Sequence, residues 1–378
     1  MRQKHNSTIL ILACFLLIFS SAFTIHPAAN FQTEDEVNLR ITQVDTSHFP
    51  QVKVYVSAMD ANGDPIPVNP ANLVLREDDQ KVTTDLVSGE GDSGQLTTLL
   101  VIDISGSMNA GGKLSMAKKV AGEYIAQMRS NDQAGIVAFN NKVNLVQSVT
   151  TDRDVLQSAI DNLKAGDDTA MYDALVKATD ELNPLSGRKA IIVLTDGLDN
   201  QSKNSPTDVL NSIGKSGLSI STIGLGDPGQ STGNMTALDE KTLSALAEKA
   251  GGSYGLATDQ ESLQQIYEKY GRALKSEYAI SYTSQSKLRD GINRSLSISL
   301  EEGGIASWSG VTKTQYNPGG LVPEVASATS WPTFFGLLAI LVILLFLPMM
   351  IRMVKRMSPQ KEAAPVMPVP KATRVKLK

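Results

Sequence analysis

Between residues 96 and 275, short apolar runs alternate with stretches in which apolar residues recur at helical spacing. Leu99–Ile102 and Ala190–Leu194 are wholly apolar, as expected of strands buried on both faces. Residues 113–129 repeat apolar side chains every three to four positions, which predicts an amphipathic helix. This alternation predicts a doubly wound α/β fold with a mostly parallel sheet and helices on both faces.

The same pattern continues to residue 275. We expect further strands over residues 135–139, 143–149, 219–225 and 253–257. The strand over 143–149 alternates apolar and polar residues, which suits the edge of a sheet. Asp152 and Thr169 stand where each could cap the helix that follows it.

Oxygen-bearing side chains follow two of the apolar runs. Asp103, Ser105 and Ser107 come directly after the first run, and Asp196 comes just after the second. Open α/β sheets bind ligands beyond the carboxyl ends of their strands. Carboxylate and hydroxyl oxygens of low total charge suit Mg²⁺ or Mn²⁺. The pattern therefore predicts a divalent-metal site at this end of the sheet.

Together with a threonine between them, these residues resemble the metal-ion-dependent adhesion site of the von Willebrand factor A family. The family pattern is D-x-S-x-S, then a distant Thr and a distant Asp, and the resemblance covers roughly residues 96–275. It implies that the two serines bind the metal directly, the threonine directly or through water, and the aspartates through water. It also implies an open position for a partner's carboxylate. The matching positions are Asp103, Ser105, Ser107, Thr169 and Asp196.

The middle segment departs from the family pattern, because Asp167 and Asp168 stand where small residues usually precede the threonine. These carboxylates either tighten the binding of the metal or disfavour an acidic partner.

Each piece of the motif also has a local explanation. Ser107 can begin a helix, Thr169 can be an N-cap, and Asp196 can lie in a turn. All three pieces in this order, two of them at strand ends, favour the metal site.

Composition excludes several other kinds of site. The net charge of -4 gives no support for a nucleic-acid surface. The single cysteine, Cys14, lies in the N-terminal apolar stretch, so the mature chain can form no disulfide. The histidines are His5, His26 and His48, all outside the α/β region. A Ser-His-Asp catalytic set or a histidine-ligated zinc therefore cannot be built there.

Both ends of the chain carry membrane signals. Residues 1–22 have a basic start, an apolar core and small residues before position 23, which predicts a signal peptide. Residues 333–351 are uncharged and long enough to span a hydrocarbon layer of ~30 Å. The tail over 352–378 is strongly basic, which predicts that it is cytoplasmic. An exported protein without disulfides fits a prokaryotic surface.

The segments around the α/β region read as β-structure. Residues 35–90 alternate at strand spacing and predict a small N-terminal β-sandwich domain. Residues 276–316 form a C-terminal β extension, expected to pair with the N-terminal strands because alone it would be marginal. Residues 317–332 contain Asn317-Pro318-Gly319-Gly320 and predict a linker.

The sequence therefore predicts a single-pass membrane protein with its ectodomain outside the cell. The resemblance implies that it binds a partner protein through Mg²⁺ or Mn²⁺ and the partner's Glu or Asp. We expect it to contact the lipid bilayer through its C-terminal helix and not to be an enzyme. Two alternatives stay open. One is a membrane subunit of an assembly or chaperone complex that works with a cytoplasmic ATPase, and the other is a metal-assisted hydrolase.

Overall fold

The structure is a computed structural model, and it describes residues 37–88, 94–214, 217–226, 238–302, 305–320 and 327–357. The predicted signal peptide, residues 1–22, and residues 358–378 of the predicted tail lie outside the described residues. The chain divides into two compact units, Met1–Val322 and Pro323–Lys378.

A six-stranded sheet forms the centre of the α/β part of the first unit. Its strands are β6 Leu96–Asp103, β7 Gln133–Phe139, β8 Val143–Thr150, β9 Arg188–Thr195, β10 Ser219–Leu225 and β11 Gly251–Ala257. The strand order is β11-β10-β9-β6-β7-β8, and only β8 runs antiparallel to its neighbour. β6, β9 and β10 are buried at every residue, and in β6 and β9 this explains the apolar runs. β8 lies at the edge, as predicted from its alternation.

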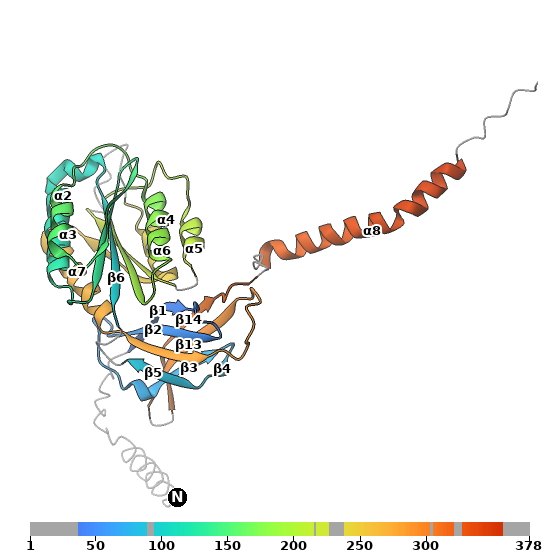
Figure 1. Cartoon of the computed structure of the whole chain (residues 1–378), viewed down its shortest axis with the longest axis horizontal. Coiled ribbons are helices and arrows are strands. Elements are labelled where there is room, and N and C mark those ends of the chain that lie inside the picture. The colour runs from blue at the N-terminus through green and yellow to red at the C-terminus, as the bar shows by residue number, and fades with distance from the viewer. Residues whose placement is uncertain are drawn as a thin grey trace, which may run out of the picture. The chain divides into compact units, whose positions relative to one another are not determined.

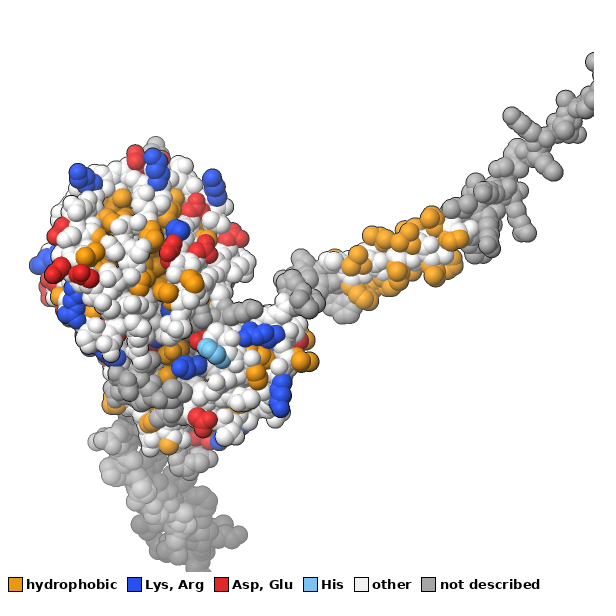
Figure 2. All heavy atoms as spheres, in the orientation of Figure 1, with side chains coloured by type: hydrophobic (Ala, Val, Ile, Leu, Met, Phe, Trp, Pro, Cys, Tyr) orange, Lys and Arg blue, Asp and Glu red, His pale blue; other side chains and the backbone are white. Residues whose placement is uncertain are grey.

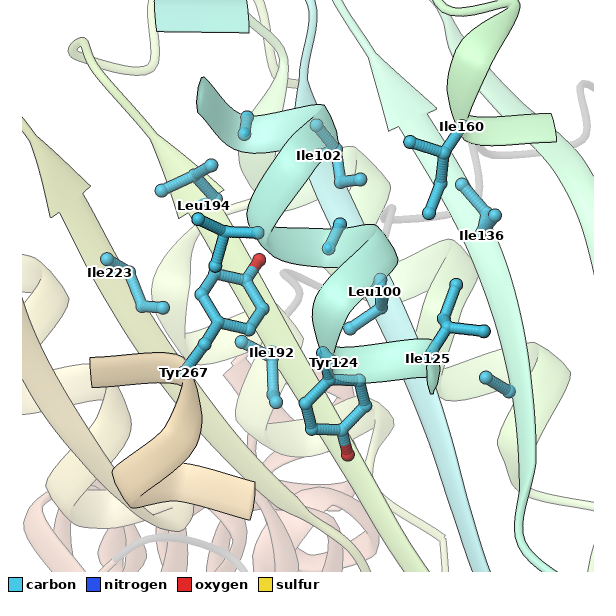
Figure 3. Packing of buried hydrophobic residues seen from close by; sticks show 14 of the residues in the cluster. Leu100, Ile102, Tyr124, Ile125, Ile136, Ile160, Ile192, Leu194, Ile223 and Tyr267 are labelled. Carbon is cyan, nitrogen blue, oxygen red and sulfur yellow. The ribbon is translucent and has the colours of Figure 1, made fainter. Parts of the chain in front are cut away.

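Helices cover both faces of this sheet (Figure 1). One face carries α2 Lys113–Ala126, α3 Arg153–Asp161 and α7 Gln260–Lys275, and the other carries α4 Met171–Leu182, α5 Pro206–Ser212 and α6 Glu240–Lys249. Leu100 of β6 packs in one apolar core with Ile125 of α2 and Tyr267 of α7 (Figure 3). A second core on the opposite face contains Val101 and Leu175. The predicted α/β fold is confirmed.

The two predicted helix caps have different outcomes. Asp152 caps α3 as predicted, because its side chain accepts two backbone N–H groups of the first turn. The prediction for Thr169 is wrong, since α4 starts after Ala170 and has no side-chain cap. The backbone N–H of Thr169 instead donates to Oδ1 of Asn200 at 3.1 Å, which holds Thr169 in the preceding loop.

A β-sandwich completes the first unit. Its strands are β1 Asn38–Asp45, β2 Gln51–Met59, β3 Leu73–Glu77, β4 Gln80–Lys81, β5 Thr84–Ser88, β12 Tyr278–Thr283, β13 Arg294–Glu302 and β14 Ile305–Tyr316. They form two four-stranded sheets with the orders β1-β2-β12-β5 and β14-β13-β3-β4. Val54, Leu75 and Ile298 lie in the apolar core between the sheets. Each sheet thus combines strands from before and after the α/β part, and the expected pairing of the two segments is present.

The second unit contains helix α8, Ser327–Met357, with Pro332 and Pro348 inside it. Its large apolar side chains from Phe334 to Leu347 are exposed, and Figure 2 shows them as a long run of orange spheres. Among the residues that the structure describes, no helix is long and apolar enough to cross a membrane. The predicted span over residues 333–351 is therefore not supported, and the side chains of residues 349–351 lie outside the described residues.

Candidate metal centre

The candidate site lies at the edge of the sheet where β6 and β9 end. These strands are parallel neighbours, with Ile102 opposite Leu194, so the residues that follow them emerge side by side. Asp103 is the last residue of β6, and Asp196 follows the last residue of β9. Both aspartates are buried, with 0% and 4% of their surface exposed. The two carboxylates are thus brought to one point by the parallel pairing of the central strands.

A chain of hydrogen bonds connects four of the predicted site residues. Oδ1 of Asp103 accepts the backbone N–H of Ser105 at 2.7 Å. The Oγ atoms of Ser105 and Ser107 lie 3.0 Å apart, and Oγ of Ser107 donates to Oδ1 of Asp196 at 2.7 Å. The D-x-S-x-S segment and the distant aspartate therefore form one cluster of oxygen atoms.

Thr195, which the motif does not include, also belongs to the cluster, because its hydroxyl donates to Oδ2 of Asp103 at 2.7 Å. Both carboxylate oxygens of Asp103 are therefore held in place. Burial raises the pKa of Asp103 to about 6, although the hydrogen bonds from Ser105 and Thr195 act in the opposite direction. The negative charge of Asp196 adds a smaller upward contribution to this pKa. Two buried carboxylates so close together create a place where a cation is favoured.

Thr169 lies in a third loop that packs against the first. The N–H of Gly106 donates to the carbonyl oxygen of Asp167 at 2.7 Å. A Cβ atom at position 106 would meet that same oxygen at 3.3 Å, so glycine permits this close approach. The carbonyl of Thr169 accepts an N–H from Asn200, in the loop after β9. These backbone bonds place the third predicted segment beside the other two.

The unexpected pair Asp167 and Asp168 lies at the surface of this loop. Both residues are exposed, and Asp167 has a φ of 68°, in the left-handed region. Oδ2 of Asp167 accepts from Nδ2 of Asn140, and Oδ2 of Asp168 accepts from Nε2 of Gln201, each at 3.3 Å. These two carboxylates are thus bonded to side-chain amides of neighbouring loops.

A lysine that the sequence analysis did not assign to the site also reaches it. Nζ of Lys113 lies 2.7 Å from Oδ2 of Asp196 and forms an ion pair with it. Lys113 is the first residue of α2 and directly follows Gly111 and Gly112. The two glycines and a basic residue in the first turn of a helix stand out in the sequence, but they do not indicate that this side chain turns back toward the end of β9.

The donor atoms of the cluster fit a hard divalent cation. Within the described ranges, no group of three or more His, Cys, Asp or Glu side chains could hold a metal ion. The cluster has two carboxylates, so hydroxyl oxygens have to supply other ligands. Ser105 and Ser107 place two such hydroxyls beside Asp196. An all-oxygen set with few charges suits Mg²⁺ or Mn²⁺ rather than zinc or copper.

Comparison with known families finds a match inside the α/β part. Residues 98–198 match the family described as the von Willebrand factor type A domain, and this stretch includes all five predicted site residues. A UPF0353 protein from Nocardia farcinica is 26% identical over 204 residues, covering 46% of this chain and 61% of the relative. An uncharacterized protein from Borreliella burgdorferi is 30% identical over 137 residues, covering 34% of this chain and 40% of the relative. The matches thus span about six tenths or less of these relatives' lengths.

Similar solved structures include a von Willebrand factor type A protein from Catenulispora acidiphila. It has 16% sequence identity and a TM-score of 0.43, with 76% of this chain and 75% of that chain covered. BatB from Bacteroides thetaiotaomicron has 21% identity and a TM-score of 0.41, with 48% of this chain and 100% of that chain covered. The family match itself shows that the chain contains a von Willebrand factor type A domain.

Proposed function

We propose that this protein binds Mg²⁺ or Mn²⁺ at the candidate site and uses the bound ion to hold a Glu or Asp side chain of a partner protein. The hydrogen-bonded cluster of Ser105, Ser107 and Asp196 supports this proposal, because it gathers hydroxyl and carboxylate oxygens at one point. The proposed ligands are Asp103, Ser105, Ser107, Thr169 and Asp196.

The chemistry of the ligands explains why a partner's carboxylate is the expected target. Ser105 and Ser107 are neutral, so they leave a bound cation with much of its charge and with room for an anionic ligand. Asp103 is held at both oxygens and orients the loop that carries the serines. The α/β part contains neither His nor Cys. We therefore propose a binding role and not an enzymatic one.

We further propose that the protein acts at the cell surface and is attached to the lipid bilayer through α8. The exposed apolar side chains from Phe334 to Leu347 support this location, because that stretch has no charged residue. A bilayer is an environment in which such a surface is favoured. In this arrangement the α/β part faces outward and the basic residues after 351 face the cytoplasm.

Calorimetric titration of the purified full chain in detergent tests the metal site. The double variant Ser105→Ala, Ser107→Ala should lose Mg²⁺ binding, because two proposed ligands are removed. The matched control is Ser148→Ala, which changes an exposed serine on the edge strand β8 and should bind Mg²⁺ normally. Equal Mg²⁺ affinity in the double variant and the wild type would contradict the assigned ligands.

A second experiment tests the partner. Capture of cell-surface proteins on the immobilised full chain should succeed in Mg²⁺ and fail in EDTA. The captured protein should also be released by millimolar acetate, a small carboxylate that competes for the open position. Capture that persists equally in EDTA would contradict a metal-dependent mechanism.

A further inference from the structure

The ion pair between Lys113 and Asp196 lies inside the candidate metal site. The Asp196 side chain is 0% exposed, whereas the Lys113 side chain is 26% exposed. Oδ1 of Asp196 accepts from Ser107 and Oδ2 accepts from the Lys113 ammonium. A carboxylate assigned to a divalent cation is therefore neutralised by a cation from its own chain.

The backbone around Lys113 is arranged to bring the side chain to this position. Gly111 and Gly112 have φ values of 60° and 70°, in the left-handed region that side-chain-bearing residues rarely adopt. They turn the chain directly before Lys113 begins α2. On the other side, Nζ lies 3.8 Å from the place where Gly226 would carry a Cβ atom. The ammonium therefore sits between the ends of β9 and β10.

Helix electrostatics do not explain a lysine at this position. The first turn of a helix favours acidic side chains and disfavours basic ones, because its free N–H groups carry partial positive charge. Lys113 is the first residue of α2, and that turn contains no acidic residue. A side chain that is unfavourable for its own helix indicates a contact elsewhere in the structure that offsets this effect. Here that role is the contact with Asp196.

We propose that Lys113 is the resident counter-ion of Asp196 in the metal-free protein and that a divalent cation displaces it from that carboxylate. This inference rests on the proposed metal site. The bound cation and the ammonium would repel each other at so short a distance. The flexible four-carbon stem of lysine lets the ammonium move outward, and its partial exposure gives it a path to solvent. The displaced ammonium then lies at the rim, where it favours an anionic partner.

Two consequences separate this role from that of an ordinary surface lysine. The ammonium competes with the metal, so Lys113→Met should raise the Mg²⁺ affinity about tenfold. The released side chain should also become more reactive toward amine reagents when Mg²⁺ binds. Loss of a nearby positive charge would raise metal affinity even without displacement, so the second consequence is the decisive one.

The experiment combines calorimetry with acetylation of the full chain by an amine-reactive ester, read by peptide mass spectrometry. In saturating Mg²⁺ the acetylation rate of Lys113 should rise at least threefold in the wild type. It should not change in the Ser105→Ala, Ser107→Ala variant. Lys119, an exposed lysine on the same helix, is the internal control and should react equally under all conditions. Lys119→Met is the matched control for the affinity measurement.

The outcomes are distinguishable. If the wild type binds Mg²⁺ and the Lys113 acetylation rate stays constant, the counter-ion role is overturned and the proposed metal site stands. If neither the wild type nor Lys113→Met binds Mg²⁺ or Mn²⁺, the proposed metal site is overturned and this inference with it. A faster reaction of Lys113 only in metal, together with tighter binding by Lys113→Met, supports the proposal.

Discussion

The guanidinium of Arg188 forms a buried ion pair with the carboxylate of Glu277. Its Nε donates to one carboxylate oxygen, and Nη2 lies 2.8 Å from the other. The two side chains are 0% and 1% exposed. Arg188 begins β9, whereas Glu277 lies between α7 and β12. The pair therefore links the start of β9, in the α/β sheet, to the segment through which the chain enters the β-sandwich.

Removing one partner of this pair should be strongly destabilising. Arg188→Met leaves the Glu277 carboxylate buried without its cation, and we expect a loss of about 3–5 kcal/mol in the free energy of unfolding. Replacing both residues, as in Arg188→Met with Glu277→Leu, should recover much of that loss. Urea denaturation of the full chain measures both variants.

The control for this prediction is an exposed ion pair. Arg272 and Asp64 are 2.9 Å apart, with side chains 55% and 47% exposed. Arg272→Met should therefore change the free energy of unfolding by less than about 1 kcal/mol. Similar losses for Arg188→Met and Arg272→Met would show that burial of the Arg188 pair has no special effect.

The raised pKa of Asp103 predicts that the free energy of unfolding of the metal-free protein falls as pH rises. Burial raises this pKa from 3.8 to about 6. The folded state therefore holds the proton more tightly than the unfolded state. The free energy of unfolding falls as pH rises from 3.8 through about 6. In EDTA, Asp103→Asn should be more stable than the wild type at pH 7.5 by about 3 kcal/mol, and this advantage should vanish near pH 4.

Urea denaturation at several pH values measures this difference. Asp180→Asn, which alters an exposed aspartate of α4, should show no such pH-dependent gain over the wild type. An advantage of Asp103→Asn that is constant from pH 4 to 7.5 would indicate better packing instead of relief of a buried charge.

Metal binding should stabilise the folded chain by mass action. With Mg²⁺ at about one hundred times its Kd, we expect a gain of about 2.7 kcal/mol in the free energy of unfolding. The gain should be reversed by EDTA and absent in the Ser105→Ala, Ser107→Ala variant. Thermal denaturation with and without Mg²⁺ provides the measurement, and an equal shift in the double variant would place the ion elsewhere.

The hydroxyl of Thr169 should contribute to metal affinity even though it does not cap α4. Thr169→Ala should weaken Mg²⁺ binding by about tenfold, because a direct or water-mediated ligand is lost. Thr169→Ser keeps the hydroxyl and should bind Mg²⁺ with nearly wild-type affinity. Calorimetric titration compares the two variants, and equal affinities would exclude a role for the hydroxyl.

The location of the protein can be tested by removing its second unit. Alkaline carbonate extraction should leave the full chain in the membrane fraction, whereas a chain ending at Val322 should be released from it. Changing exposed Leu341 and Leu345 to Asp should also release the full chain, because the apolar surface of α8 is interrupted. Release of the unmodified full chain by carbonate would contradict attachment through α8.

The α/β fold could be predicted from sequence because its central strands are buried on both faces. Complete burial of β6 and β9 produces the apolar runs, and their parallel pairing brings Asp103 and Asp196 together. Lys113 could not be found in this way, since a flexible side chain leaves no pattern in the surrounding residues. Thr169 was misplaced as a cap for a related reason. Its backbone bond to Asn200 depends on a loop distant in sequence.

The arrangement of the β-sandwich has a consequence for the order in which the protein can mature during synthesis. β12 lies between β2 and β5, yet the whole α/β part separates it from them along the chain. The early strands therefore leave the ribosome without their central neighbour and expose unpaired edges until residues 278–283 follow. The α/β part, by contrast, carries all six strands of its own sheet between residues 96 and 257. Its sheet and the metal-site loops can therefore form without the closed β-sandwich.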